Sequence, residues 1–472
     1  MQLTMRQRVL VVLHAALCLV ALTGVACGPR GRIAANRPAP EAVRPAAALS
    51  AEDEAMLEDL SKRSFMFFWE QADPSTGIVR DRSRTNGSPV DGQARNIGSI
   101  AAVGFGLSGL CIAAERQWIP RADAIARART TLRFFAERID HQRGWFYHFI
   151  DLGTGKREWK SELSSIDTAL LLAGVLTVRQ CFASDAAIPG LAESIHRRVD
   201  FAWMLAGDPR VLSHGWRPES GFLDGRWDHY CELMILYLLA IGSPTHPIPA
   251  ESWQAWRRPI TTFEGQTYVG GPDPLFVHQY SHAWVDFRGW REGEAPHTDW
   301  WENSVTATRV HKAFCLRLSG EFPGYSENVW GITASDSRKG YVAWGGPPRH
   351  QAIDGSVVPC AAGGSLMLAP DITVPALREM RRRFGDRVYG RYGFADAFHP
   401  TEDWVDPDVI GIDLGITLLS AENLRTGRVW RWFMQNAEIP SAMTRAGLVR
   451  VPSSPPLQEV RSTDWGEVRV RR

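Results

Sequence analysis

The sequence predicts an all-α protein built from helices that pair through short loops. Apolar residues recur at helical spacing in about ten to twelve segments. No regular alternation of strands and helices interrupts these segments. The loops between them hold most of the acidic and aromatic residues, as expected where function lies in loops on a rigid scaffold. The pattern indicates a ring of helical hairpins, although periodicity alone is compatible with any large all-α domain.

The N-terminal segment, residues 1–27, resembles an export signal. Arg6 and Arg8 precede the apolar run VLVVLHAALCLVALTGVA, which ends before Cys27. A basic start, a short apolar core and small residues before a cleavage point are typical of a secretory signal rather than a membrane span. The residues before Cys27 resemble a bacterial lipoprotein box, with Gly24 where Leu is usual, so ordinary cleavage stays open beside lipidation. We expect a periplasmic or outer-membrane-attached protein whose only contact with a membrane is a lipid on Cys27.

A flexible tether over residues 28–49 is predicted to lead into the first helices. Ser50 is placed to cap the first helix, with Asp53 three residues later as in a capping box. Three glycines at 104, 106 and 109 lie inside the next apolar segment. Glycine lowers helix propensity, so we expect close packing against another helix there. After the helix that starts at Ser50, this half is predicted to contain helices at 99–116, 120–139, 164–182 and 191–205 and a hairpin at 145–161.

The stretch 217–249 joins a polar, aromatic segment to a helix that is apolar on every side. Its run ELMILYLLAI ends at Gly242 and Pro244, a normal helix stop, and such a helix is buried. Asp228 and Glu232 lie four residues apart, so they would share one face of its first turn. Either both acids only cap the helix, or the helix pushes them into a pocket lined with Trp and Tyr. The second arrangement is what cleavage of a glycosidic bond requires.

The second half continues the helical pattern after a Trp- and Gly-rich segment. That segment contains ESWQAWRRP and LFVHQYSHAWVDFRGW, and we interpret it as an ordered insertion. The interval 321–365 is dominated by loops. We expect one catalytic domain over residues 50–450 and a loose tail from 451 to 472. The helices predicted in this half cover residues 303–319, 374–384, 413–424 and 429–438.

Composition narrows the possible function classes. The formal net charge is +1, and no basic block stands beside regularly spaced aromatics, which argues against nucleic-acid binding. The chain contains 19 Trp, and indole stacks well on the apolar faces of sugar rings, so we expect a carbohydrate groove. The cysteines after Cys27 lie in apolar helical segments without C-x-x-C spacing. This spacing predicts core thiols rather than a zinc site.

Candidate carboxylates occur in four parts of the chain. For each acid, an N-cap or a salt bridge explains its presence as well as catalysis does. Several of them nevertheless stand at helix starts beside Trp, Tyr and Gly. In an antiparallel ring alternate helices begin at the same rim, so these acids could converge on one site. They are Glu162 and Asp167, Asp228 and Glu232, Glu327, and the group Asp396, Asp408 and Asp413.

A family resemblance covers about residues 55–445, with its blocks in order. The blocks include FMFFWEQADPSTGIVRDR, GWRPESGFLDGRWDHYCELMILYLLAIGSPTHPIPAESW, FVHQYSHAWVDFRG, YSENVWGITASD, GYVAWGGPP, DGSVVPCAAGGSL and YGFADAFHP followed by WVDPDVIGIDLG. Together they resemble the bacterial glycoamylase-like domain, a family that includes endo-β-1,2-glucanases and the related domain of cyclic β-1,2-glucan synthases. The resemblance implies an (α/α)6 toroid of the six-hairpin glycosidase type with ordered loop insertions. It also implies an inverting hydrolase of β-linked glucan, most closely β-1,2-glucan, without metal or cofactor. We expect this protein to be exported and monomeric.

Inversion assigns different roles to two carboxyl groups. One protonates the leaving oxygen, and the other activates water on the opposite face of the sugar. We predict Glu232 as the acid, because the buried helix would raise its pKa. Asp413 is the first candidate for the base, held ionised by a helix N-terminus, and Asp396 is the second. Glu162 and Asp167 are further catalytic candidates. The predicted substrate-binding residues are Arg217, Trp227, Asp228, His229, Tyr230, Glu327, Trp330 and Trp344.

One block departs from the family pattern. This chain has Ile412-Asp413-Leu414-Gly415-Ile416, whereas the usual family pattern is Ile-Asp-Gln-Gly-Pro. The change keeps the aspartate but removes an amide donor from the expected sugar pocket. The resemblance therefore implies that the chemistry survives while the usual substrate is in doubt.

Two other function classes fit parts of the sequence. A non-catalytic, glucan-binding lipoprotein would use the same Trp-rich groove but would not need a matched acid and base. A toroid-type lyase for uronic acids would rely on His, Tyr and Arg in a basic groove. The acid-rich motifs and the near-neutral charge argue against the lyase.

Overall fold

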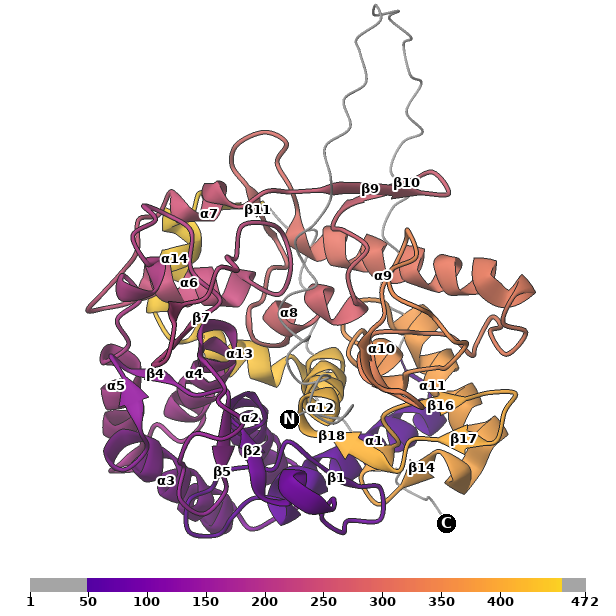
Figure 1. Cartoon of the computed structure of the whole chain (residues 1–472), viewed down its shortest axis with the longest axis horizontal. Coiled ribbons are helices and arrows are strands. Elements are labelled where there is room, and N and C mark those ends of the chain that lie inside the picture. Colours follow the sequence, from indigo (N-terminus) through magenta and orange to yellow (C-terminus); the bar gives the residue numbers. More distant parts are fainter. Residues whose placement is uncertain (1–48, 452–472) are drawn as a thin grey trace, which may run out of the picture.

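The computed structural model describes residues 49–451, and helices dominate this part of the chain (Figure 1). The predicted signal, Cys27 and most of the predicted tether and tail lie outside the described residues. None of the helices in 49–451 is long and apolar enough to cross a membrane. The α-helices are α1 (Ala51–Glu70), α2 (Ile100–Glu115), α3 (Arg121–Glu137), α4 (Ser165–Cys181), α5 (Ile188–Arg197), α6 (Met234–Gly242), α7 (Ser252–Ala255), α8 (Tyr280–Trp284), α9 (Trp300–Arg317), α10 (Pro359–Gly363), α11 (Pro370–Phe384), α12 (Gly411–Thr426), α13 (Arg428–Met434) and α14 (Glu438–Arg445).

Buried and half-exposed helices alternate along the chain. The helices α2, α4, α6, α8, α10 and α12 are buried along almost their whole length. By contrast, α1, α3, α5, α9 and α11 bury one face and expose the other. Figure 1 shows α3 and α5 at the outer left edge, with α2 and α4 between them and α12. The helices therefore form an inner and an outer layer.

Glycine explains how closely two inner helices approach. A Cβ atom added to Gly104 of α2 would lie 2.1 Å from the carbonyl oxygen of Leu170 in α4. A Cβ added to Gly174 of α4 would lie 2.1 Å from the carbonyl oxygen of Gly104. No side chain fits at such distances, so both positions require glycine. The prediction of close helix packing at Gly104 is confirmed.

Short antiparallel strand pairs join the loops between the helices. The pair β1–β18 connects the beginning of the chain with its end, with Arg82 opposite Ile410 and Arg84 opposite Asp408. The other sheets are β2–β5, β3–β4, β6–β7–β8, β9–β10, β11–β19, β12–β13, β14–β15 and β16–β17. The strands are β1 (Arg82–Arg84), β2 (Ile97–Ser99), β3 (His141–Gln142), β4 (Trp145–Phe146), β5 (Phe149–Asp151), β6 (Leu163–Ser164), β7 (Gly215–Arg217), β8 (Gly221–Phe222), β9 (Ile260–Phe263), β10 (Gln266–Val269), β11 (Trp290–Glu292), β12 (Ala334–Ser337), β13 (Gly340–Ala343), β14 (Tyr389–Gly390), β15 (Gly393–Phe394), β16 (Phe398–His399), β17 (Trp404–Val405), β18 (Asp408–Ile410) and β19 (Leu448–Arg450).

The predicted helices agree with the observed helices mainly where the helical repeat of apolar residues extends over many residues. Ser50 caps α1, and its hydroxyl accepts a hydrogen bond from the Asp53 amide at 3.1 Å. The predicted insertion, however, contains the buried helix α8, whose five residues are too few to show a helical period. Similarly, α6 begins at Met234, so Asp228 and Glu232 lie before its first turn rather than in it.

Candidate active site

Glu232 stands at the entrance to the buried helix α6, which is capped from a distant part of the chain. The Ser281 hydroxyl accepts a hydrogen bond from the Ile235 amide at 3.0 Å and donates one to the Glu232 carbonyl oxygen at 2.8 Å. Ser281 belongs to α8. The reading in which Asp228 and Glu232 only cap the helix is therefore wrong. The Glu232 carboxyl group stays available for another role.

The surroundings of Glu232 favour its protonated form. Burial raises the pKa of its carboxyl group to about 7, and the negative charges of Asp273 and Asp167 act in the same direction. The side chain is nevertheless only half-buried by surface area. The predicted rise of this pKa is confirmed, and its main physical cause is loss of solvation, as predicted.

Glu162 and Asp167 are held by ion pairs around His148, which lies between β4 and β5. The His148 Nδ1 atom lies 3.2 Å from Glu162 Oε1, and its Nε2 atom lies 3.5 Å from Asp167 Oδ1. Burial alone would lower the pKa of His148, but Asp167 and Glu162 raise it to about 9. The second oxygen of Glu162 accepts a hydrogen bond from Arg217 at 3.2 Å. Both acids are thus engaged with cations, which favours a positioning role over proton transfer.

Asp413 and Asp396 form a second, more deeply buried pair of acids. Asp413 lies in the first turn of α12 and is 6% exposed, while Asp396 lies between β15 and β16 and is 5% exposed. Burial, and then the charge of Asp396, raises the pKa of Asp413 well above its usual range. The prediction that a helix N-terminus holds Asp413 ionised is therefore wrong. Loss of solvation beside a second carboxylate outweighs the helix dipole.

Asp396 has the better support for a negative charge. Its Oδ2 atom accepts hydrogen bonds from the Ser335 hydroxyl at 2.6 Å and from the Asp336 amide at 3.2 Å. Burial raises the pKa of Asp396 above its usual value, although these donors and the Arg82 guanidinium partly oppose the rise. Within residues 49–451 no comparable set of donors faces Asp413, so a negative charge on the pair is better stabilised on Asp396.

The substituted position Leu414 contributes to this environment. Leu414 is 6% exposed and lines a cavity of about 20 Å³ together with Asp396 and Asp413. An aliphatic side chain offers neither a hydrogen bond nor solvation to the carboxyl pair. The next residue, Gly415, is required for packing, because an added Cβ would lie 2.4 Å from the Phe105 ring.

Electrostatic contacts join the two groups of acids into one site. The buried Tyr280 of α8 has its pKa raised first by burial and then by charges that include both Asp413 and Glu232. On the other side, the charge of Asp81 acts on both His148 and Arg82. The site therefore collects residues from the first turns of α4, α8 and α12 and Glu232, which lies two residues before α6.

Four predicted substrate-binding aromatics are buried. Trp330 is 0% exposed and Trp344 is 1% exposed, so neither presents a ring face to a ligand. Tyr230 is 0% exposed, stacks on Trp300 with ring centroids 5.2 Å apart, and shares a hydrogen bond with His278. Trp227 is also buried and donates its ring N–H to the Ser165 hydroxyl at 2.7 Å. The prediction of direct sugar stacking by these residues is corrected, because their rings pack in the core.

The polar residues predicted to bind substrate differ in their exposure and in their contacts with the site acids. Asp228 and Arg217 keep side chains that are 41% and 38% exposed. Burial would raise the pKa of Asp228, but a hydrogen bond with His229 and the nearby Arg257 lower it. The charge of His229 lowers the pKa of Asp273, and the charge of Asp273 raises the pKa of Glu232. Asp273 therefore links His229 and Asp228 electrostatically to Glu232. Glu327 is 72% exposed and pairs with Lys312 of α9, and it makes no hydrogen bond or ion pair to the site acids within residues 49–451.

Sequence reasoning missed several residues of the site. They occur in VRDR, FVHQYSHAW and YSENVWGITASD, which belong to the family blocks, and in the predicted hairpin at 145–161. Their roles depend on contacts with distant segments, so the local pattern contains no signal for them. The missed residues are Asp81, Arg82, His148, Tyr280, Ser335 and Asp336.

In residues 49–451, one group of carboxylate side chains lies close enough together to bind a single metal ion. It consists of Asp336, Asp406 and Asp408, which each offer one carboxylate oxygen within 4.8 Å of the others. Asp336 and Asp408 also contact the backbone or side chain of Asp396. The group therefore borders the buried acid pair.

The chain is similar to several known proteins. Residues 224–437 match a family model described as "Putative glucoamylase". A curated relative, the exo beta-1,2-glucooligosaccharide sophorohydrolase (non-reducing end) of Parabacteroides distasonis, is 27% identical over 433 residues. The match covers 83% of this chain and 58% of the relative, so the chain spans little more than half of that protein's length.

Two solved structures resemble almost the whole described chain. A Bacteroides uniformis protein that bears the same glucoamylase description has a TM-score of 0.78 and 28% identity, over 85% of this chain and 98% of its own. The endo-beta-1,2-glucanase of Chitinophaga pinensis, solved with sophorotriose and glucose, has a TM-score of 0.77 and 28% identity, over 85% and 99%. These comparisons agree with the predicted resemblance: residues 224–437 match the glucoamylase family model, and the chain is similar to glycoside hydrolases named for β-1,2-linked glucan.

Proposed function

We propose that this chain hydrolyses β-1,2-linked glucan with inversion, using Glu232 as general acid and the Asp396–Asp413 pair as general base. The observation that carries the proposal is the difference between the surroundings of the two acid groups. Glu232 has a pKa of about 7, whereas Asp396 has the donors that favour a carboxylate. Pairs of carboxyl groups whose surroundings separate their pKa values are typical of acid–base catalysis.

The scaffold proposed for this chemistry is an (α/α)6 toroid. The alternation of buried and half-exposed helices from α1 to α12 supports it. In such a ring the N-termini of the inner helices share one rim. Glu232, Tyr280 and Asp413 stand at or just before the N-termini of α6, α8 and α12, which is where a substrate bound at that rim would meet them.

Glu232 is suited to donate a proton to the leaving oxygen. A general acid works best when its pKa lies near the operating pH, and a value of about 7 keeps much of Glu232 protonated in neutral solution. No cation pairs with its carboxyl group among residues 49–451. Glu162 and Asp167, by contrast, are each paired with His148.

Asp396 is suited to accept a proton from water, directly or through a substrate hydroxyl. The Ser335 hydroxyl, the Asp336 amide and Arg82 stabilise its carboxylate. Asp413 would keep its proton and donate a hydrogen bond, within the pair or to the substrate. This reverses the order of the two candidates for the base, because the donors are concentrated on Asp396.

The substrate class comes from the relatives and fits the composition of the site. The Parabacteroides and Chitinophaga relatives are named for β-1,2-linked glucan. The half-exposed polar groups Arg217, Asp228 and His229 lie beside the acids. Such groups can hydrogen-bond sugar hydroxyls, while the buried aromatics fix the scaffold behind them.

We also propose that the chain is exported and held at a membrane by a lipid on Cys27. The segment from Arg6 to Cys27 supports this proposal, with its basic start, apolar core and small residues. A Cys27→Ser variant should move from the membrane fraction to the soluble periplasm. An unchanged distribution contradicts the lipid anchor.

The acid assignment is tested with Glu232→Gln, which keeps the shape but cannot donate the proton. General acid–base assistance is worth roughly 10²–10⁴-fold, so kcat on β-1,2-glucan should fall by about that factor while KM stays similar. In the unchanged enzyme, kcat should decline as the pH rises through about 7, because Glu232 then loses its proton. That decline should be absent from the residual activity of Glu232→Gln.

Glu321→Gln is the matched control, because Glu321 is exposed and pairs with Arg349. It should keep normal kcat. A panel of α- and β-linked glucans of other linkages should give at most slow hydrolysis. Near-normal turnover of Glu232→Gln, or equal hydrolysis of all linkages, would contradict the proposal.

A further inference from the structure

We propose that the carboxylates of Asp336, Asp406 and Asp408 bind a divalent, oxygen-preferring cation, and that this cation is Ca²⁺. The inference goes beyond the proposed hydrolysis and does not depend on it. The sequence offers no ligand spacing for such a site, because the ligands come from separate strands and the loop before one of them. The fold brings them together.

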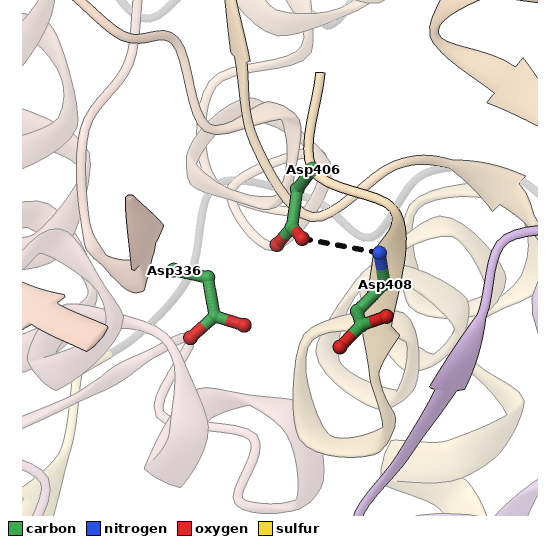
Figure 2. A group of neighbouring side chains, drawn as sticks. All are labelled: Asp336, Asp406 and Asp408. Carbon is green, nitrogen blue, oxygen red and sulfur yellow. Dashed lines mark hydrogen bonds between the residues drawn. The ribbon is translucent and has the colours of Figure 1, made fainter. Parts of the chain in front are cut away.

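The three carboxyl groups face a common space (Figure 2). Asp336 comes from β12, Asp408 from β18, and Asp406 from the turn between β17 and β18. One oxygen atom of each lies within 4.8 Å of the corresponding atoms of the other two. Oxygens at such separations can ligate one Ca²⁺, for which the metal–oxygen distances are about 2.3–2.6 Å.

A buried oxygen atom of Asp406 points to a missing partner. Asp406 is 4% exposed, and its Oδ1 atom accepts a hydrogen bond from the Asp408 amide at 3.1 Å. Its Oδ2 atom is buried and has no hydrogen-bond partner within residues 49–451. A buried charged oxygen without a partner costs free energy. A cation between the three acids supplies the partner.

The charged side chains around Asp336, Asp406 and Asp408 also leave an excess of negative charge. Arg82 pairs with Asp336 at 2.5 Å and with Asp81 at 3.0 Å. Arg84 pairs with Asp408 at 2.7 Å and with Asp91 at 3.0 Å. Both arginines are therefore already shared between two acids, and neither has an ion pair with Asp406 in the described residues. A divalent cation offsets the remaining excess of negative charge.

The donor set selects the type of cation. All three ligands are carboxylates, which suit Ca²⁺ and Mg²⁺, whereas zinc sites use histidine and cysteine. Mg²⁺ demands near-ideal octahedral geometry, while Ca²⁺ accepts irregular arrangements of six to eight oxygens. The Asp336 side chain is 16% exposed, so water can reach the remaining positions. An irregular site of this kind favours Ca²⁺.

The cation would hold the strands that position Asp396. The Asp396 amide donates to the carbonyl oxygen of Asp408 at 3.1 Å. The Asp396 carboxylate in turn accepts from the Asp336 amide. Two of the three ligands therefore contact Asp396 directly, and the cation acts on it through them as a positioning element.

Binding is tested without substrate, on protein stripped with a chelator and dialysed. Titration calorimetry with CaCl₂ should show one site per chain, and the thermal midpoint should rise with CaCl₂ until the site is saturated. Asp406→Asn should weaken Ca²⁺ binding at least about tenfold. Asp403→Asn, in the same loop but with a fully exposed side chain, should bind like the unchanged protein. MgCl₂ should bind more weakly than CaCl₂.

Absence of both binding heat and a thermal shift in the unchanged protein would overturn the inference. Equal Ca²⁺ affinity of Asp406→Asn would do so as well. If Asp406→Asn does not fold, Asp336→Asn replaces it, because its partly exposed side chain makes it the milder change. Hydrolysis that persists while no cation binds would reject the cation site and leave the proposed function standing.

Discussion

The two acid groups of the site differ in how their charges are matched. In the first, which we term the Glu232 group, His148 pairs with Glu162 and Asp167, Arg217 pairs with Glu162, and Glu232 has no paired cation in the part of the chain that the structure describes. In the second, the Asp396 group, Asp336, Asp396, Asp406, Asp408 and Asp413 share Arg82 and Arg84. In the Glu232 group the acids and cations nearly balance, apart from Glu232 itself, whose pKa is raised. The Asp396 group has more acids than cations.

This difference shows how one fold can separate two roles for the same side-chain type. In the Glu232 group, burial raises the pKa of the acid that has no paired cation in residues 49–451, which suits the proposed role of proton donor. In the Asp396 group, Asp396 has the most hydrogen-bond donors, which suits the proposed role of base. The surroundings rather than the residue type decide which carboxyl group gives a proton and which takes one.

The largest effect on kcat is expected from substitution of Asp396, and the comparison with Asp413 distinguishes the roles of the two acids. Asp396→Asn should lower kcat by roughly 10²–10⁴-fold, because it removes the proposed base. Asp413→Asn replaces a protonated carboxyl group by an amide that can still donate a hydrogen bond, so its kcat should fall less. Steady-state kinetics on β-1,2-glucan compares the two. A larger loss for Asp413→Asn would return the role of base to Asp413.

His148→Gln should mainly affect stability. It leaves Glu162 and Asp167 without their shared cation, and removing one partner of a buried ion pair costs about 3 kcal/mol. The raised pKa of His148, about 9, fixes the pH dependence. Its contribution is fully present below the ordinary value of about 6.5 and is lost as the pH rises through about 9.

Urea denaturation of both proteins at pH 6 and at pH 9.5 checks this expectation. The difference in the free energy of unfolding between the unchanged protein and His148→Gln should be large at the lower pH and small at the higher one. His246→Gln serves as the control, because His246 is exposed. A difference that does not change with pH would show that the His148 ring acts through packing alone.

Asp273→Asn should have the smallest of these effects. The negative charge of Asp273 helps to raise the pKa of Glu232, so its removal should move the basic limb of the kcat–pH profile to lower pH. Asp371→Asn, whose acid is exposed on α11, should leave the profile unchanged. A basic limb that does not move with Asp273→Asn would mean that another group controls it.

Part of this molecule was predictable from local pattern. The cap at Ser50, the buried segment from Ile100 and the close approach at Gly104 follow from residue type and spacing. The raised pKa of Glu232 followed from the apolar run after it. In each case the determining residues are neighbours in the chain, or the packing requirement is carried by a single residue type.

The rest depended on contacts between distant segments. Ser281 caps α6 from α8, so the start of that helix at Met234 could not be predicted from the residues before it. The burial of Trp330 and Trp344 depends on which loop covers them. The raised pKa of Asp413 depends on Asp396 and therefore on how the start of α12 meets a separate loop.

The anomeric configuration of the first product tests the central claim most directly. If Glu232 and Asp396 act as acid and base on opposite faces of the bond, hydrolysis of a β-linked glucan proceeds with inversion. Proton nuclear magnetic resonance, recorded within minutes of adding enzyme to β-1,2-glucan, should show the α-anomer accumulating before mutarotation. Initial formation of the β-anomer would contradict the account, because it requires a covalent intermediate and a carboxylate that acts as nucleophile.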